Sequence, residues 1–160
     1  MRLYTIKTPK FVKRLFPRLV WEFPVTTKTI YLTFDDGPTP EITPLVLQEL
    51  KKYNAKATFF CIGKNIVNHP EIFQEIISDG HTVANHTQHH ENAWKVSSKI
   101  YLDNINATAE LLPKDTAKLF RPPYGKLTPK VSKKILKTGY KIIMWNVLSG
   151  DFDTTLSKEK

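Results

Sequence analysis

The stretch that decides the fold reads Thr33-Phe34-Asp35-Asp36-Gly37-Pro38. Apolar residues occupy every second position from Ile30 to Phe34, and this period of two predicts a β-strand over residues 29–34. The Gly-Pro pair that follows ends the strand. Asp35 and Asp36 therefore lie at the carboxyl end of a strand, the edge at which α/β folds bind their ligands. Two adjacent carboxylates repel each other, so a bound cation is one interpretation and a solvated Asp-Asp-Gly turn is the other.

Strand and helix patterns alternate along the rest of the chain. Further strands are predicted over residues 57–62, 81–85, 119–120 and 140–147. Helices are predicted over about residues 43–53, 69–80, 98–112 and 128–139. This alternation indicates parallel strands with crossover helices. A spacing of about 30 residues per unit favours a barrel-like sheet over a sandwich.

The charge of the chain is concentrated at its N-terminus. Its 160 residues suit one domain, and 24 Lys and Arg against 15 Asp and Glu give a net charge of +9. Seven of the first 28 residues are Lys or Arg. We therefore divide the chain into a basic N-terminal extension, residues 1–28, and a main domain, residues 29–160. The extension suits weak contact with an anionic surface. Nucleic-acid binding is not predicted, because clustered aromatic residues and a recognition helix are lacking.

The N-terminal extension contains a short helix and no export signal. Thr8 and Pro9 resemble the cap and first position of a helix that Pro17 ends, and this helix either closes one end of the domain or acts as a basic amphipathic anchor. The sequence has no run of 18 apolar residues and no visible signal peptide, so the cytoplasm is the default expectation. Cys61 is the single cysteine, lies in an apolar run, and is expected in the core.

Reactive side chains follow four of the predicted strands. They are Asp35, Asp36, His86, His90, Arg121, Tyr124 and Asp151. In a barrel the carboxyl ends of the strands meet at one mouth, so these residues are expected to converge. His86 and His90 are four residues apart, and with a carboxylate they form a set that suits Zn²⁺, with Co, Fe, Mn and Ni as alternatives. His89 is the competing ligand, and a histidine-rich turn without a site is the other interpretation.

Three motifs in this order identify a family. They are Thr33-Phe34-Asp35-Asp36-Gly37-Pro38, Asn85-His86-Thr87-x-x-His90 and Arg121-Pro122-Pro123-Tyr124-Gly125. Together they resemble the polysaccharide deacetylase family, carbohydrate esterase family four, which includes chitin deacetylases and peptidoglycan N-acetylglucosamine deacetylases. The resemblance covers about residues 28–153. It implies an α/β fold, a distorted (β/α) TIM-like barrel, that removes acetyl groups from glycans with one divalent metal ion.

The resemblance also implies a role for each matching residue. The implied metal ligands are Asp36, His86 and His90. Asp35 would be the general base that activates metal-bound water, Arg121 would orient that base, and Tyr124 would lend its backbone N–H to the oxyanion. General chemistry agrees, because a bound metal lowers the pKa of water, a nearby carboxylate can accept the proton, and an amide N–H stabilises an oxyanion.

The chain departs from the family pattern near its C-terminus. The fourth motif usually reads Asp-x-x-Asp-Trp, and here it reads Leu148-Ser149-Gly150-Asp151-Phe152. Asp151 matches the second Asp of this motif. Leu148 stands in place of the first Asp, and Phe152 stands in place of the Trp. The fifth motif supplies a histidine as general acid, but no histidine follows His90. We therefore expect the last strand or strands of the domain to be missing from this chain, with residues 157–160 as the first turn of an uncompleted helix; a natural pseudoenzyme is the alternative.

The function expected from this resemblance is that of a metal-dependent hydrolase. It would remove N-acetyl groups, by cleaving non-peptide carbon–nitrogen bonds, from a glycan such as a chitooligosaccharide or peptidoglycan. The alternatives are an O-acetyl esterase acting on a polysaccharide and an inactive glycan-binding remnant. This chain alone is expected to be impaired, because the group that protonates the leaving amine is missing. An open sheet edge would also favour self-association.

Overall fold

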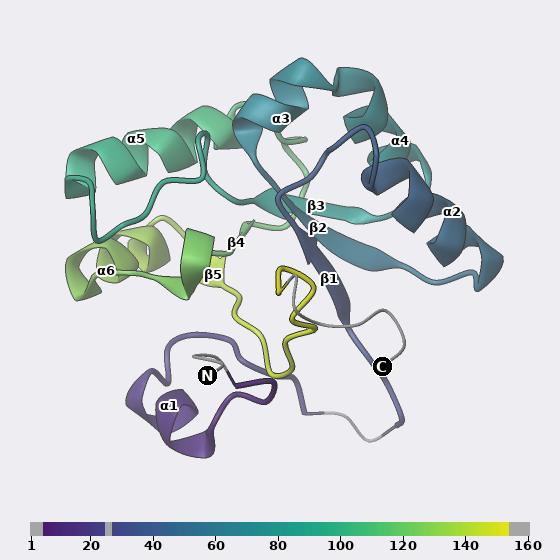
Figure 1. The fold of residues 1–160 in the computed structure, drawn as a ribbon. Helices are drawn as coiled ribbons and strands as arrows, with labels where there is room; N and C mark the ends of the chain where they lie inside the picture. The colour runs from purple at the N-terminus through teal and green to yellow at the C-terminus, as the bar shows by residue number, and fades with distance from the viewer. Residues whose placement is uncertain (1–4, 25–26, 154–160) are drawn as a thin grey trace.

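The strands form one parallel sheet in the order of the sequence. The computed structural model describes residues 5–24 and 27–153. The strands are β1 (Leu32–Asp35), β2 (Ala57–Cys61), β3 (Thr82–Asn85), β4 (Leu119–Phe120) and β5 (Lys141–Ile142). Each pairs in parallel with the next, so the order is β1-β2-β3-β4-β5. This confirms the expected α/β architecture, and the sheet is an open array with β1 and β5 at its edges (Figure 1).

Helices α2 to α6 cover one face of this sheet, and α1 lies apart from them (Figure 1). The helices are α1 (Lys10–Leu15), α2 (Thr43–Lys52), α3 (Gly63–Asn68), α4 (Pro70–Ser78), α5 (Ser98–Ala109) and α6 (Pro129–Lys137), with a 3-10 turn η1 (Pro123–Gly125). Proline is the first residue of α4 and of α6 and the second residue of α2. In the first turn of a helix its missing N–H costs no hydrogen bond. Ser97 and Thr128 cap α5 and α6 by accepting hydrogen bonds from backbone N–H groups.

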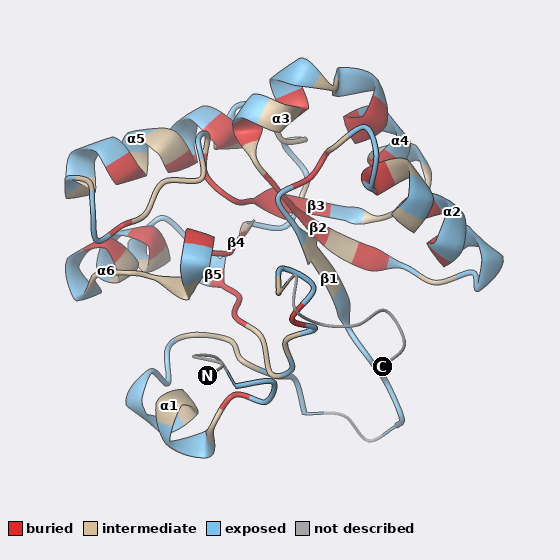
Figure 2. Cartoon of the chain, viewed as in Figure 1, coloured by how far each residue is buried: buried red, intermediate tan, exposed pale blue. Residues whose placement is uncertain are grey.

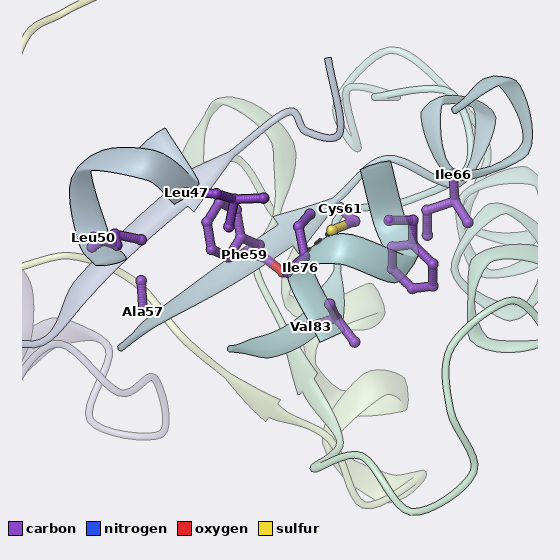
Figure 3. Packing of buried hydrophobic residues seen from close by; sticks show 9 residues of the cluster. Leu47, Leu50, Ala57, Phe59, Cys61, Ile66, Ile76 and Val83 are labelled. Atoms are coloured by element: carbon purple, nitrogen blue, oxygen red, sulfur yellow. Dashed lines mark hydrogen bonds between the residues drawn. The ribbon is translucent and has the colours of Figure 1, made fainter. Parts of the chain in front are cut away.

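The core consists of buried residues on the two faces of the pleated strands. Between the sheet and helices α2 to α4 lie Leu47, Leu50, Ala57, Phe59, Cys61, Ile66, Phe73, Ile76 and Val83 (Figure 3). A second cluster, centred on Tyr101, Phe120 and Ile135, packs beneath α5 and α6. On the other face of the strands, Phe60 and Ala84 pack with Ile143. Figure 2 shows the result, with buried residues along the strands and the inner sides of the helices.

Several predicted boundaries are wrong. The first strand begins at Leu32 instead of residue 29, and Ile30 is 83% exposed. The helix predicted over residues 98–112 ends at Ala109. The strand predicted over residues 140–147 is two residues long, as is its partner β4, and beyond it the backbone forms isolated bridges with the N-terminal segment. The helix α3 was not predicted, since six residues carry too little periodicity to signal one.

The core faces of two helices also differ from the predicted ones. For α2 the periodicity predicts a face of Val46, Leu50 and Tyr53; Leu50 is buried, but it is joined by Leu47, and Tyr53 is 76% exposed. For α5 the predicted face is Leu102, Ile105, Ala109 and Leu112; Ile105 is buried as predicted, and Tyr101 and Thr108 are buried in place of the others. The 3.6-residue period defines the apolar face of a helix only to within about one residue. Packing against the sheet decides which side chains become buried.

The N-terminal segment is joined to the chain that follows β5. The Thr8 N–H donates to the Asn146 carbonyl at 2.8 Å, and its hydroxyl donates to the Trp145 carbonyl at 2.7 Å. Pro9, not Thr8, is therefore the residue before α1. Helix α1 contains no buried residue, and Phe11 is 70% exposed, which contradicts the expectation that this helix closes one end of the domain. Within the described residues, no helix is long and apolar enough to cross a membrane.

The single cysteine provides a test of this core. Cys61 is fully buried, and burial raises the pKa of its thiol to about 12. Since the thiolate is the reactive form, we expect a disulfide reagent at pH 8 to modify Cys61 at least about 10³-fold more slowly in the folded protein than in denaturant, because modification needs a large opening of the core. Equal rates in the two conditions, with the folded circular dichroism spectrum retained, would contradict this packing.

Candidate metal centre

Three side chains converge beyond the carboxyl ends of β1 and β3. Asp36 follows β1, and His86 and His90 lie on the loop after β3. Ligand atoms of these three residues all lie within 4.8 Å of one another. The Asp36 Oδ1 atom is 3.3 Å from His86 Nε2 and 3.2 Å from His90 Nε2. Two imidazoles and one carboxylate are thus arranged around one point, as expected from the spacing of the motifs.

The hydrogen bonds of the imidazoles direct their Nε2 atoms toward Asp36. His86 Nδ1 lies 2.7 Å from the Arg121 carbonyl oxygen, which can only accept, so Nδ1 carries the proton. Nε2 of His86 then presents a lone pair toward the Asp36 carboxylate. His90 Nδ1 bonds the Tyr124 hydroxyl at 3.2 Å, which leaves its Nε2 directed to the same oxygen. Such orienting contacts to the far nitrogen are typical of metal-binding histidines.

The charge states of this group suit a divalent cation. Burial lowers the pKa of His90, so the imidazole is neutral at neutral pH although the Asp36 charge opposes the shift. Burial acts to raise the pKa of Asp36, but contact with His86 and His90, which attract the carboxylate whenever their rings are protonated, outweighs it and lowers that pKa. The ionised carboxylate and the lone pair of His86 Nε2 repel each other unless a positive charge lies between them, and His90 Nε2 offers a second lone pair when its Nδ1 donates to the Tyr124 hydroxyl. The nitrogen and oxygen donors therefore fit a metal ion such as Zn²⁺.

Strained backbone conformations hold these side chains in place. Asp36, Thr87, His90 and Tyr124 all have positive φ angles, between 55° and 69°, which non-glycine residues seldom adopt. Hydrogen bonds offset the strain at two of these positions. Asn65 of α3 donates its amide to the Asp36 carbonyl at 2.7 Å, and the Thr87 N–H donates to the Asn85 side chain at 2.9 Å. Strain of this kind is typical of functional sites.

An ion pair between the buried Arg121 and the partly exposed Asp35 lies beside the three side chains. Arg121 follows β4 and is 3% exposed, and its Nη1 donates to Asp35 Oδ1 at 2.7 Å and to the Thr33 hydroxyl at 2.8 Å. Its Nε and Nη2 donate to the carbonyls of Ile143 and Met144. Burial lowers the pKa of Arg121, and the Asp35 carboxylate opposes that shift. The Asp35 carboxylate is thereby fixed next to Asp36 in the chain but outside the metal-ligand group.

The remaining predicted residues occupy different positions. His89 is exposed and is not part of the group, so the geometry favours His90 as the second histidine. Tyr124 lies at the group, and its backbone N–H donates to no acceptor among the residues that the structure describes. Asp151 is exposed, accepts a hydrogen bond from the Ser149 hydroxyl at 2.8 Å, and lies outside the group; its role stays a prediction.

Sequence reasoning missed three supporting groups: the Thr33 hydroxyl, the Asn65 amide and the Tyr124 hydroxyl. Each contacts a predicted residue through a long-range hydrogen bond, which periodicity cannot reveal. Gly63 is the residue whose type could have signalled this close packing in the sequence. A Cβ at this position would overlap the Gln88 side chain and the Thr108 hydroxyl. A glycine directly after a strand indicates such a close approach, and α3, which carries Asn65, begins there.

Known proteins share this sequence and fold. Residues 23–143 match the family model described as polysaccharide deacetylase. The chain is 38% identical over 132 residues to a peptidoglycan-N-acetylglucosamine deacetylase of Bacillus cereus, a match that covers 81% of this chain and 48% of the relative. It is 36% identical over 125 residues to a chitooligosaccharide deacetylase of Bradyrhizobium, covering 76% and 57%. The chain thus spans about half the length of these curated relatives.

A solved structure supports the same assignment. Bacillus subtilis PdaA, described as a family 4 carbohydrate esterase, superposes with a TM-score of 0.80 and 28% identity, over 94% of this chain and 67% of that one. The fold, the order of the motifs and the family model agree, and the chain belongs to the polysaccharide deacetylase family.

Proposed function

We propose that this protein hydrolyses the acetamide group of N-acetylhexosamines in a glycan with the help of one divalent metal ion. The observation that carries the proposal is the position of the Asp35–Arg121 ion pair directly beside the group of Asp36, His86 and His90. The relatives named above are deacetylases of peptidoglycan and chitooligosaccharide, which supports an acetylated amino sugar as substrate.

Asp36, His86 and His90 would hold the metal ion, and Zn²⁺ suits their donor atoms best. A divalent ion supplies Lewis acidity and lowers the pKa of water enough for attack at neutral pH. Asp35 would accept the proton of the attacking water, because its carboxylate lies beside the ligand group and outside it. Arg121 holds that carboxylate at one oxygen and leaves the other free for the proton.

Tyr124 would stabilise the charge that develops on the acetyl oxygen. Its backbone N–H is without an acceptor among the described residues, and its φ of 60° is imposed by the turn η1. An amide N–H that is fixed before substrate binds stabilises negative charge without reorganisation during the reaction. The same apparatus could cleave an O-acetyl ester, but the N-acetyl activity of both named relatives favours the amide.

The first test concerns the metal ligands. We expect Asp36→Ala and His90→Ala to weaken Zn²⁺ binding by more than about 100-fold, because a site with three protein ligands loses one of them. His89→Ala is the matched control and should bind Zn²⁺ like the wild type, since His89 is exposed and outside the group. Isothermal titration of the metal-free protein measures all three affinities. Equal loss in His89→Ala would show that the wrong histidine has been chosen.

The second test separates the base from the ligands. Asp35→Asn should keep Zn²⁺ affinity within about tenfold and lower turnover by roughly 10² or more, the usual loss when a general base is removed. Turnover is followed as acetate released from N-acetylglucosamine oligomers. Asp103→Asn is the control, because Asp103 pairs with Lys99 on the exposed surface of α5. A folded Asp35→Asn variant that no longer binds metal would make Asp35 a ligand and contradict the assigned roles.

A further inference from the structure

Two large aromatic side chains are exposed beside the candidate metal centre. Trp94 is 64% exposed and Tyr124 is 60% exposed. Trp94 lies on the loop after β3, and Tyr124 lies on the loop after β4, the neighbouring strand. Exposed Trp and Tyr side chains in one place are informative because such rings usually become buried on binding a ligand.

Contacts between the two loops bring Trp94 close to the metal-ligand group. The Tyr124 ring packs against His90 with 4.6 Å between ring centroids. Two residues further along the same loop, Lys126 Nζ lies 5.0 Å from the centre of the Trp94 ring. The Trp94 indole N–H donates to the carbonyl of the next residue, Leu127, at 3.1 Å. The turn over residues 124–126 therefore lies between His90, which Tyr124 contacts, and Trp94, which Lys126 contacts.

The Trp94 side chain is fixed before any ligand arrives. Besides the bond from its indole to Leu127, its backbone N–H donates to the Asn92 side chain at 2.9 Å. The preceding residue, Ala93, is buried in the core cluster beneath α5 and α6 and anchors the loop. The ring is held by its edge and has Lys126 over one face, so its other face is available and it loses little conformational entropy on binding, which favours recognition of a rigid, partly apolar ligand.

Lys126 adds a positive charge to this aromatic surface. No carboxylate lies within ion-pairing distance of its ammonium group among residues 5–24 and 27–153. The ammonium instead contacts the Trp94 ring, a cation–π contact that holds the charge next to the ring at the surface. A ligand that suits both groups has an apolar ring face and a negative charge at its rim.

We propose that Trp94 and Lys126 form a sugar subsite next to the metal centre that binds a pyranose ring carrying a free carboxylate, as N-acetylmuramic acid does where no stem peptide is attached to it. The C–H face of the sugar stacks on the Trp94 indole, and the carboxylate pairs with the Lys126 ammonium. The inference rests on the proposed function, since it assigns the substrate class of that same site. It favours a peptidoglycan strand without stem peptides over the uncharged chitooligosaccharide.

The test measures binding separately from turnover. Two tetrasaccharides are titrated calorimetrically into the zinc-loaded protein: chitotetraose, which is uncharged, and the alternating N-acetylglucosamine–N-acetylmuramic acid tetramer without stem peptides. The wild type should bind the acidic tetramer more tightly. Trp94→Ala should weaken both ligands by up to about tenfold, and Trp94→Phe, which keeps a ring, should recover part of the loss. Lys126→Met should weaken the acidic tetramer alone, by about two- to fivefold.

Matched surface variants serve as controls. Tyr53→Ala removes an aromatic ring that is 76% exposed at the end of α2, and Lys133→Met removes an exposed charge on α6. Neither should change the affinity for either sugar.

The outcomes distinguish the subsite from the catalytic proposal. Unchanged affinities in Trp94→Ala and Lys126→Met overturn the subsite, even if the wild type releases acetate. Absence of measurable binding of either tetramer overturns it as well. Weaker binding in Trp94→Ala together with no acetate release by the wild type supports the subsite and overturns the deacetylase assignment. Equal weakening of the binding of both sugars by Lys126→Met would show that Lys126 does not recognise the carboxylate, and would overturn the preference for an acidic sugar.

Discussion

The buried guanidinium of Arg121 is the constraint on which the rest of this structure depends. Arg121 follows β4, yet it bonds Thr33 and Asp35 of β1, three strands away in the order of the sheet. In a flat sheet the spacing between strands would separate β4 from β1 by roughly 14 Å, beyond the reach of one side chain. The sheet must therefore curve strongly, as the strands of a barrel do. The open sheet therefore already has the curvature of a barrel, as the bonds from Arg121 after β4 to Thr33 and Asp35 of β1 require.

Burial of that charge also explains why the site is rigid. A buried cation without partners would be costly, and here every guanidinium nitrogen donates to an oxygen, while the group stacks on the Phe60 ring at 4.1 Å. The Arg121 backbone serves the site as well, since its N–H bonds the Asn85 carbonyl and its carbonyl accepts from His86. The residue that curves the sheet therefore also fixes the tautomer of one histidine and the position of the Asp35 carboxylate.

The second feature of the site is that its side chains lie on strained turns instead of regular elements. Positive φ angles at Asp36, His90 and Tyr124 turn the backbone so that residues from three loops face one point. The stable parts of the fold offset the cost of this strain, because the strands before each turn are paired and the helices after them are packed in the core. The exposed Trp94 is likewise held in a loop, by its buried neighbour Ala93 and by two hydrogen bonds.

Local signals in the sequence determined much of this arrangement. Alternating apolar residues, Gly-Pro and Thr-Pro pairs, and helical periodicity act within a few residues, so they correctly predicted parallel strands, most helices and the placement of Asp36, His86 and Arg121 at strand ends. The motif order likewise predicted the family. Two adjacent carboxylates and two histidines four residues apart indicated a metal site because that chemistry requires those residue types.

Contacts between distant residues were decided by the tertiary structure alone. The motif resemblance implied His90 as a ligand and Arg121 as the partner of Asp35, but the contacts themselves depend on a left-handed turn at His90 and on an ion pair that spans 86 positions in the sequence. Strand β5 pairs only with the two residues of β4, and the chain beyond it bonds the N-terminal segment. The burial of Tyr101 depends on how α5 packs. Sequence patterns carry no record of such pairings. The direction of each side chain is set by backbone turns and packing partners that come together only when the chain folds.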